Sequence, residues 1–205
     1  LEVDESFADD CCREIFDICI GALSSVEEMN QGAMEAVPYS WFEVRTVSYG
    51  EELSHTPLSG ISSLATTCLE RMLQKSLIPE PLSYATYLAG SRSPIVRRIA
   101  VHLIQIAPEL SNEERVSWLQ SCGLVFSYQE YHEVFLLIHR VLSDTDDTGV
   151  EAILGFLNDA YVTRTEESAG STDAFLLDYF IHLAYYLSVK LYNSEVIKKF
   201  YRSVQ

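Results

Sequence analysis

Residues 93–104 read SPIVRRIAVHLI, and this stretch decides the fold class. A serine followed by a proline is typical of a helix N-terminus, because the first helical position has no use for the amide hydrogen that proline lacks. Val96, Ala100 and Leu103 then recur at helical spacing, and the small Ala100 allows a neighbouring helix to approach closely. A shorter helical pattern, residues 82–89, comes just before. The sequence therefore predicts a helix, a tight turn and a second helix over residues 82–107.

Helical signals continue through the rest of the chain. Capping boxes, in which a hydroxyl and a carboxylate three residues later bond to each other's backbone amides, are predicted at Ser111, Ser127 and Thr148. Gly90 and Gly123 lie where a left-handed residue would end a helix. No proline follows Pro108, which favours long helices in the last part of the chain. We expect helices at residues 5–22, 61–76, 81–89, 94–107, 112–122, 128–143, 148–162, 172–191 and 194–203.

Two segments have other patterns. Residues 41–49 read WFEVRTVSY, and their alternating β-branched and aromatic side chains predict one short strand or an extended connection. Residues 163–173 are polar and include Gly170, so we expect a loop there. One strand cannot make a sheet, so the predicted class is all-α.

Charge divides the chain unevenly. Its 205 residues include 14 Lys or Arg and 30 Asp or Glu, giving a formal net charge of −16. Such a balance opposes binding to nucleic acid, which depends on clustered cations. Residues 1–60 alone hold 13 of the acidic side chains and 2 of the basic ones. We therefore predict an acidic helical segment with an extended connection over 1–60, packed on a helical repeat domain over 61–205.

The longest apolar run, residues 175–192, contains Asp178, His182 and Lys190, so the sequence predicts no membrane-spanning segment. Five cysteines lie within helical patterns, and their odd number favours reduced thiols in a cytoplasmic protein. The chain begins at Leu1 rather than Met and ends directly after a helical pattern. We therefore expect a part of a longer intracellular protein.

Residues 82–107 resemble a HEAT-type, armadillo-related repeat. The second helix of that repeat carries a Val-Arg-x-x-Ala pattern, matched here by Val96, Arg97 and Ala100, followed by Val101 and Ile104. Ser91 departs from the family, which usually has an aspartate there that pairs with an arginine of the adjacent repeat. A weaker echo over residues 148–154 follows about 54 residues later, a longer spacing than a regular array has. The resemblance implies an irregular HEAT-like helical repeat or a layered helical domain.

A second resemblance rests on residues 93–100, on Trp118 and Leu119, and on residues 132–137. These segments are similar to helical regions of large prokaryotic proteins, including antiphage defence proteins with a sirtuin-like or P-loop NTPase effector. That resemblance implies a sensor or assembly arm whose catalytic domain lies elsewhere in the parent chain.

Motifs for chemistry are absent from the sequence. The nine glycines form neither a phosphate-binding loop nor a Gly-x-Ser-x-Gly elbow. Residues 144–149 resemble the start of a calcium loop, but Gly155 stands where a bidentate glutamate is required. We therefore predict a non-catalytic module without a metal or cofactor. An enzyme or a metal-binding helical bundle that uses the Cys and His residues stays open as the alternative.

The predicted role is binding to another protein or to other domains of the parent chain, with a second copy of this chain as a further option. Stacked helix pairs offer an extended face for such contacts. The candidate contact residues are Arg97 and Arg98, from the central basic cluster, and Tyr179 and Tyr186, seven residues apart on the last long helix. Pairing with local carboxylates for the arginines, and burial in the core for the tyrosines, are the alternatives.

Overall fold

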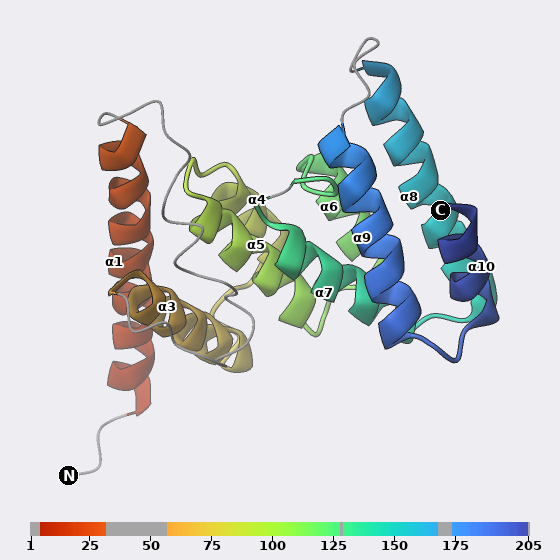
Figure 1. Cartoon of the computed structure of the whole chain (residues 1–205). Coiled ribbons are helices and arrows are strands. Elements are labelled where there is room, and N and C mark those ends of the chain that lie inside the picture. Colours follow the sequence, from red (N-terminus) through yellow and green to blue (C-terminus); the bar gives the residue numbers. More distant parts are fainter. Residues whose placement is uncertain (1–4, 32–56, 128, 168–173, 205) are drawn as a thin grey trace. The chain divides into compact units, whose positions relative to one another are not determined.

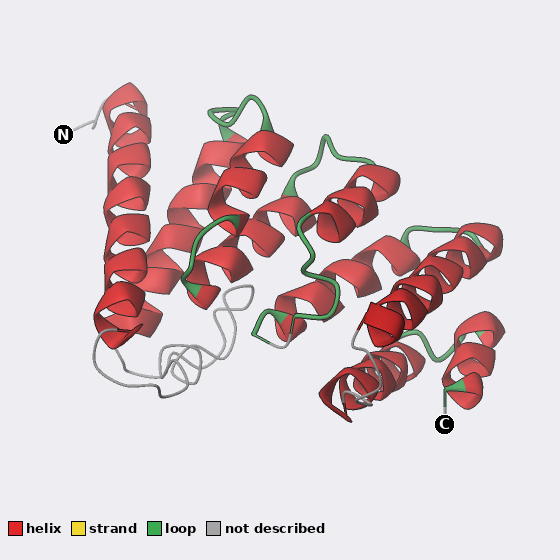
Figure 2. Cartoon of the chain, turned by 90° about the horizontal axis from the view of Figure 1, so that it is seen from above, coloured by secondary structure: helices red, strands yellow, loops and turns green. Residues whose placement is uncertain are grey.

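The structure is a computed structural model that describes residues 5–31, 57–127, 129–167 and 174–204 (Figure 1). Throughout these ranges the only regular secondary structure is helical, as Figure 2 shows, so the predicted all-α class is confirmed. The chain divides into two compact units, Leu1–Leu110 (unit 1) and Ser111–Gln205 (unit 2). Unit 1 contains α1 (Glu5–Gln31), α3 (Pro57–Gln74), α4 (Pro81–Ala89) and α5 (Pro94–Ile106). Unit 2 contains α6 (Asn112–Ser121), α7 (Tyr131–Ser143), α8 (Asp147–Glu167), α9 (Ala174–Lys190) and α10 (Glu195–Ser203).

The units divide the chain at a different point from the boundary predicted at residues 60 and 61. In unit 1, α1 packs against α3 and also touches α5. The acidic N-terminal helix is therefore part of the same compact unit as the helices that follow it. Phe16 and Leu23 of α1 are fully buried on its covered face, although Ile15 and Ile18 of the same helix stay exposed.

The predicted hairpin of two helices over residues 82–107 is present as α4 and α5, which pack on each other. Pro94 occupies the first turn of α5, as its sequence predicts. Arg97 donates hydrogen bonds from Nη1 to the carbonyls of Ser91 (3.0 Å) and Arg92 (2.9 Å), so the arginine on which the HEAT resemblance rests holds its own turn together. Leu103 and most of its neighbours on α5 are buried, which makes this helix the centre of unit 1.

Helix ends test the predicted caps one by one. Ser111 and Glu114 form the complete capping box of α6. Gly123 has a φ of +66° and ends α6 in a left-handed turn, as predicted, whereas Gly90 is right-handed. The predicted box at Thr148 is wrong, because Asp146 caps α8 instead: its Oδ1 accepts from the amide of Gly149 at 2.8 Å.

Two further expectations need correction. Helix α7 begins at Tyr131 rather than at residue 128, and Ser127, the predicted cap, instead bonds its hydroxyl to the Glu130 carboxylate ahead of the helix. Helix α8 runs to Glu167, so residues 163–167 of the predicted polar loop are helical. The rest of that loop, residues 168–173, and the predicted strand at residues 41–49 lie outside the described residues.

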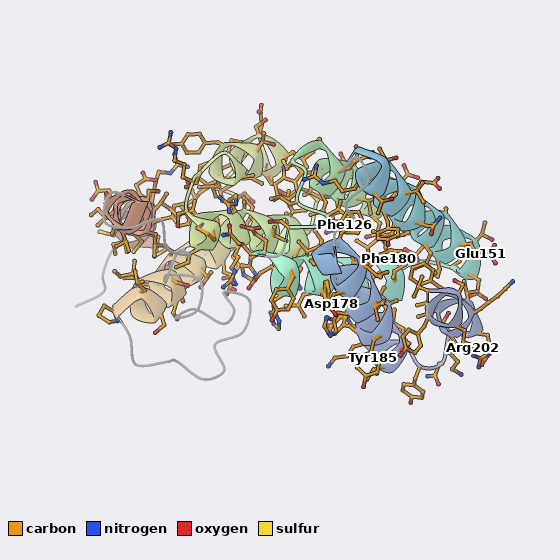
Figure 3. The ribbon with its side chains drawn as sticks, turned by 45° about the horizontal axis from the view of Figure 1, so that its top comes forward. Phe126, Glu151, Asp178, Phe180, Tyr185 and Arg202 are labelled. Atoms are coloured by element: carbon orange, nitrogen blue, oxygen red, sulfur yellow. The ribbon has the colours of Figure 1, made fainter. Side chains whose placement is uncertain are left out.

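Unit 2 is organised around an aromatic cluster between α7, α8 and α9. Phe126 and Phe180 meet edge to face with ring centroids 6.2 Å apart (Figure 3), and Tyr161 stacks on Phe180 at 4.5 Å. Phe200 of α10 contacts Phe180 from the other direction, at 5.6 Å. Pairs of this kind add stability beyond the area that they bury. Aromatic side chains therefore make up much of the packing between these helices, while Tyr131, Tyr185 and Tyr192 of the same unit stay exposed.

Candidate functional site

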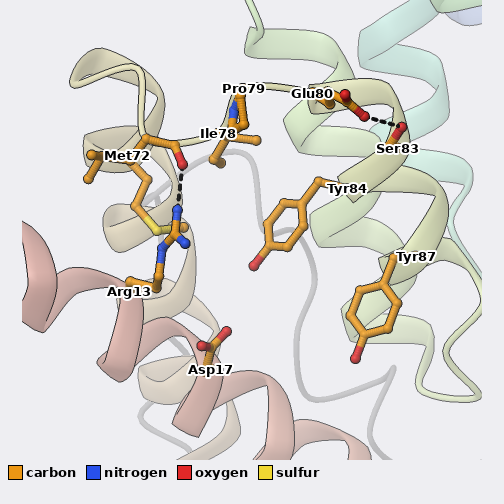
Figure 4. A pocket seen from close by; sticks show the side chains of 10 residues that line it. Arg13, Asp17, Met72, Ile78, Pro79, Glu80, Ser83, Tyr84 and Tyr87 are labelled. Carbon is orange, nitrogen blue, oxygen red and sulfur yellow. Dashed lines mark hydrogen bonds between the residues drawn. The ribbon is translucent and has the colours of Figure 1, made fainter.

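A pocket of about 430 Å³ opens in unit 1, between α1, the α3–α4 connection and α4 (Figure 4). Its size lies within the range of small-molecule and side-chain binding sites. Buried apolar side chains, Met72 and Ile78, form part of its wall, and exposed polar groups lie around them. The complete lining is Arg13, Asp17, Met72, Leu77, Ile78, Pro79, Glu80, Ser83, Tyr84 and Tyr87.

The connection after α3 takes its shape from a left-handed serine. Ser76 has a φ of +55°, its amide bonds to the Leu73 carbonyl at 2.9 Å, and the Leu77 amide bonds to the Met72 carbonyl at 2.8 Å. This pair of bonds is the Schellman motif, which reverses the chain at a helix end. The Leu77 carbonyl is left free to face α1, and Arg13 donates to it from Nη2 at 2.5 Å.

Asp17 lies one helical turn after Arg13 on α1 (Figure 4). Residues four apart on a helix can pair, but the Arg13 guanidinium is directed to the Leu77 carbonyl instead. In the part of the chain that the structure describes, the Asp17 carboxylate is exposed and forms no ion pair. The pocket therefore has an acidic group on its α1 wall with no ionic partner among the described residues.

Two tyrosines of α4 form the opposite wall, and Figure 4 shows both rings projecting from that helix. Tyr84 is half-buried and packs on Phe16, with ring centroids 6.0 Å apart. Burial and the nearby Asp17 charge raise the pKa of Tyr84 to about 12, so its hydroxyl stays protonated at neutral pH. Tyr87 is 75% exposed, the highest fraction among the large apolar and aromatic side chains that the structure describes.

At the start of α4 the Ser83 hydroxyl donates to the Glu80 carboxylate at 3.1 Å. Activation of a serine nucleophile commonly requires a base that a third group orients, such as histidine. The pocket residues include neither histidine nor cysteine. Its groups can donate or accept hydrogen bonds, stack and attract charge, all of which can serve recognition.

The thiols offer a second place for chemistry, between α1 and α3. Burial, together with Cys12 and Cys19, raises the pKa of the Cys68 thiol to about 11. Such a thiol stays protonated at neutral pH, which makes it a weak nucleophile and a weak metal ligand. Across the described ranges, no three His, Cys, Asp or Glu side chains lie close enough together to hold a metal ion.

The four predicted contact residues are divided between the two units. Arg97 and Arg98 belong to unit 1, and Tyr179 and Tyr186 to unit 2. Arg98 is only 2% exposed, because residue 98 lies on a face of α5 that is covered, whereas Arg97 is half-buried at the turn. Burial argues against a contact role for Arg98. The role of Arg97 stays a prediction.

The two tyrosines differ in the same way. Tyr179 is 4% exposed and donates its hydroxyl hydrogen to the Val125 carbonyl at 2.8 Å, so it is a core residue rather than a contact residue. Tyr186 is half-buried, with its ring 5.5 Å from that of Phe135 and with the Lys190 ammonium 5.9 Å from its centroid. Its contact role stays a prediction.

Sequence reasoning missed the pocket residues Arg13, Asp17, Tyr84 and Tyr87. A partial signal exists: Arg13 and Asp17 share one helical face, and so do Tyr84 and Tyr87. The pocket itself forms only because α4 approaches α1. That approach joins residues about 70 positions apart, so a local sequence pattern does not predict it.

Comparisons with protein-family models, with curated proteins and with solved structures found no match to this chain. Among the described helices, none is long and apolar enough to cross a membrane.

Proposed function

We propose that this chain is a non-catalytic helical module for protein–protein interaction, and that the pocket of unit 1 is its contact surface. The observation that carries the proposal is the Tyr87 ring, which stands 75% exposed beside a pocket of about 430 Å³. Tyrosine is enriched among the residues that dominate binding energy, because it offers a large rigid surface and a polar tip.

Other features support the same function. Arg13, Asp17, Tyr84 and Tyr87 of the pocket lie on regular helices, which hold their side chains in fixed positions, and the lining suits recognition. The α4–α5 hairpin agrees with the helical-repeat resemblance, whose families commonly bind proteins on extended faces. A cytoplasmic location, a larger parent protein and a role in antiphage defence belong to this proposal as its more specific parts.

A displayed library of random dodecapeptides tests the proposal directly. The full chain is immobilised, and enriched peptides are then measured against Tyr87→Ala and against a matched variant, Tyr192→Ala. Tyr192 is a suitable control because it is also a highly exposed tyrosine, 64%, but belongs to unit 2. We expect peptides that lose about tenfold or more in affinity with Tyr87→Ala, the usual effect of a binding hot spot, and that keep their affinity with Tyr192→Ala.

Two outcomes would overturn the proposal. One is a library that yields no peptide with saturable binding. The other is a set of peptides that bind Tyr87→Ala as tightly as the unchanged chain, which would place the contact surface elsewhere.

A further inference from the structure

We infer that the pocket of unit 1 receives an arginine side chain presented by a partner polypeptide, with Asp17 as the counter-charge and Tyr84 and Tyr87 as the aromatic wall. This inference rests on the proposed function, since it names the chemistry of the partner at the same site.

Charge in the pocket favours a cation. Its ionic lining consists of Arg13, Asp17 and Glu80, so one positive charge stands against two negative ones. Arg13 is committed to the Leu77 carbonyl at 2.5 Å, and Glu80 accepts from the Ser83 hydroxyl. Within the described chain neither carboxylate has an ionic partner. An incoming guanidinium would supply the missing positive charge and the matching donors.

Shape and surface favour arginine among the cations. A guanidinium is planar, stacks on aromatic faces and binds carboxylates through two parallel hydrogen bonds, whereas an ammonium is a strongly hydrated point charge. Tyr84 and Tyr87 offer rings on the wall opposite Asp17 (Figure 4), and the buried side chains of Met72 and Ile78 suit the three methylenes of the stem.

The remaining question is whether the arginine belongs to a polypeptide or is the free amino acid. A free arginine also carries an α-ammonium and an α-carboxylate, so its net charge equals that of an arginine within a chain, and the acidic pocket attracts both. Its α-carboxylate would find no free cation in the lining, because Arg13 is already bonded to a carbonyl. An arginine within a peptide chain lacks that carboxylate, so the site commits to a partner protein.

The inference is tested by titrating the isotope-labelled full chain with each of three small probes. Binding is monitored through the NMR shifts of the backbone amides. N-acetyl-arginine amide mimics an arginine within a chain. N-acetyl-citrulline amide has the same shape without the charge, and free arginine adds an α-ammonium and an α-carboxylate. We expect saturable shifts at Asp17 and Tyr84 with the first probe, and binding of the other two that is about tenfold weaker because charge-assisted contacts are lost or opposed.

Two variants test whether Asp17 is the counter-charge of the bound guanidinium. Asp17→Asn should weaken N-acetyl-arginine amide by about fivefold, the upper range for a partly exposed ion pair. Glu14→Gln is the matched control: it removes one negative charge from the same helix, but Glu14 does not line the pocket. In salt of about 0.15 M, long-range effects of either charge are largely screened, so only direct contact separates the two variants.

Equal binding of the arginine and citrulline amides would overturn the inference, as would unchanged binding by Asp17→Asn. Tighter binding of free arginine would overturn the polypeptide source and assign a small-molecule site. If the library peptides depend on Tyr87 but contain no arginine and ignore these probes, the proposed interaction function stands and the arginine inference alone fails.

Discussion

Two connections in this molecule, one in each unit, begin with the same turn and then differ. In unit 1 the chain leaves α3 through left-handed Ser76, and in unit 2 it leaves α6 through left-handed Gly123. Both turns have the two backbone bonds of the Schellman motif. In each, a carbonyl shortly afterwards accepts from a side chain of a distant helix: Leu77 from Arg13 and Val125 from Tyr179.

We call these two hydrogen bonds, from Arg13 to Leu77 and from Tyr179 to Val125, clamps, and their surroundings differ. Tyr179 is buried beside Phe126 and Phe135, with ring centroids 5.7 Å and 5.2 Å away. Arg13 is exposed, and next to it the pocket stays open. The same backbone arrangement is thus closed over by aromatic rings in unit 2 and lies beside an open pocket in unit 1, the pocket for which we propose a binding role.

Truncating the two clamping side chains should give the largest difference between the connections. We expect Tyr179→Ala to lower the free energy of unfolding by about 3–5 kcal/mol, because a large buried ring is lost, and Arg13→Ala to lower it by about 1 kcal/mol or less. Urea unfolding followed by circular dichroism measures both. Equal costs for the two variants would contradict the distinction between a closed and an open connection.

The next largest effect separates the core of unit 1 from its pocket wall. Leu103 is fully buried, so Leu103→Ala should cost about 2–5 kcal/mol, whereas Tyr87→Ala should stay within about 0.5 kcal/mol of the unchanged chain. The same urea experiment compares them. If Tyr87→Ala lowered the free energy of unfolding by more than about 1 kcal/mol, the ring would stabilise the fold, which would contradict its assignment as an exposed pocket wall.

The stability of the chain at alkaline pH should depend on the buried hydroxyl of Tyr179. Burial, and to a lesser degree the charge of Glu130, raises the pKa of Tyr179 well above its ordinary value. A raised pKa means that Tyr179 keeps its proton to a higher pH in the folded state than in the unfolded state. Its contribution to the free energy of unfolding is therefore complete below about pH 10 and is lost as the pH rises further. Tyr179→Phe should therefore flatten the fall in unfolding free energy above pH 10 by about 1.4 kcal/mol per pH unit. An unchanged slope would mean that the ring is accessible to solvent.

Substitutions at the two left-handed positions should give the smallest effects. Ser76→Gly should stabilise unit 1 by about 0.5–1 kcal/mol, because glycine adopts a positive φ without the steric cost that serine bears. Gly123→Ala should destabilise unit 2 by a similar amount, about 1 kcal/mol. Thermal unfolding measures both shifts, and a loss of stability with Ser76→Gly would argue against strain at that turn.

Local sequence signals predicted the helices well, since periodicity and caps act within a few residues. Pro94, the Ser111 box and left-handed Gly123 were all correct. Arg98 shows the limit of the method: next to Arg97 in sequence, it points to a covered face of α5 that only tertiary packing defines. The pocket and both clamps join residues more than 50 positions apart, so no local pattern could reveal them.

The bonds from Arg97 to two carbonyls of its own corner also bear on how such a chain changes its length. A ladder of ion pairs between neighbouring hairpins would fix their separation, because each rung needs its counterpart at a set distance. The two bonds of Arg97 lie within one corner, so they need no neighbouring hairpin. They would stay in place if segments before α4 lengthened or shortened, which makes uneven spacing of helix pairs compatible with this corner.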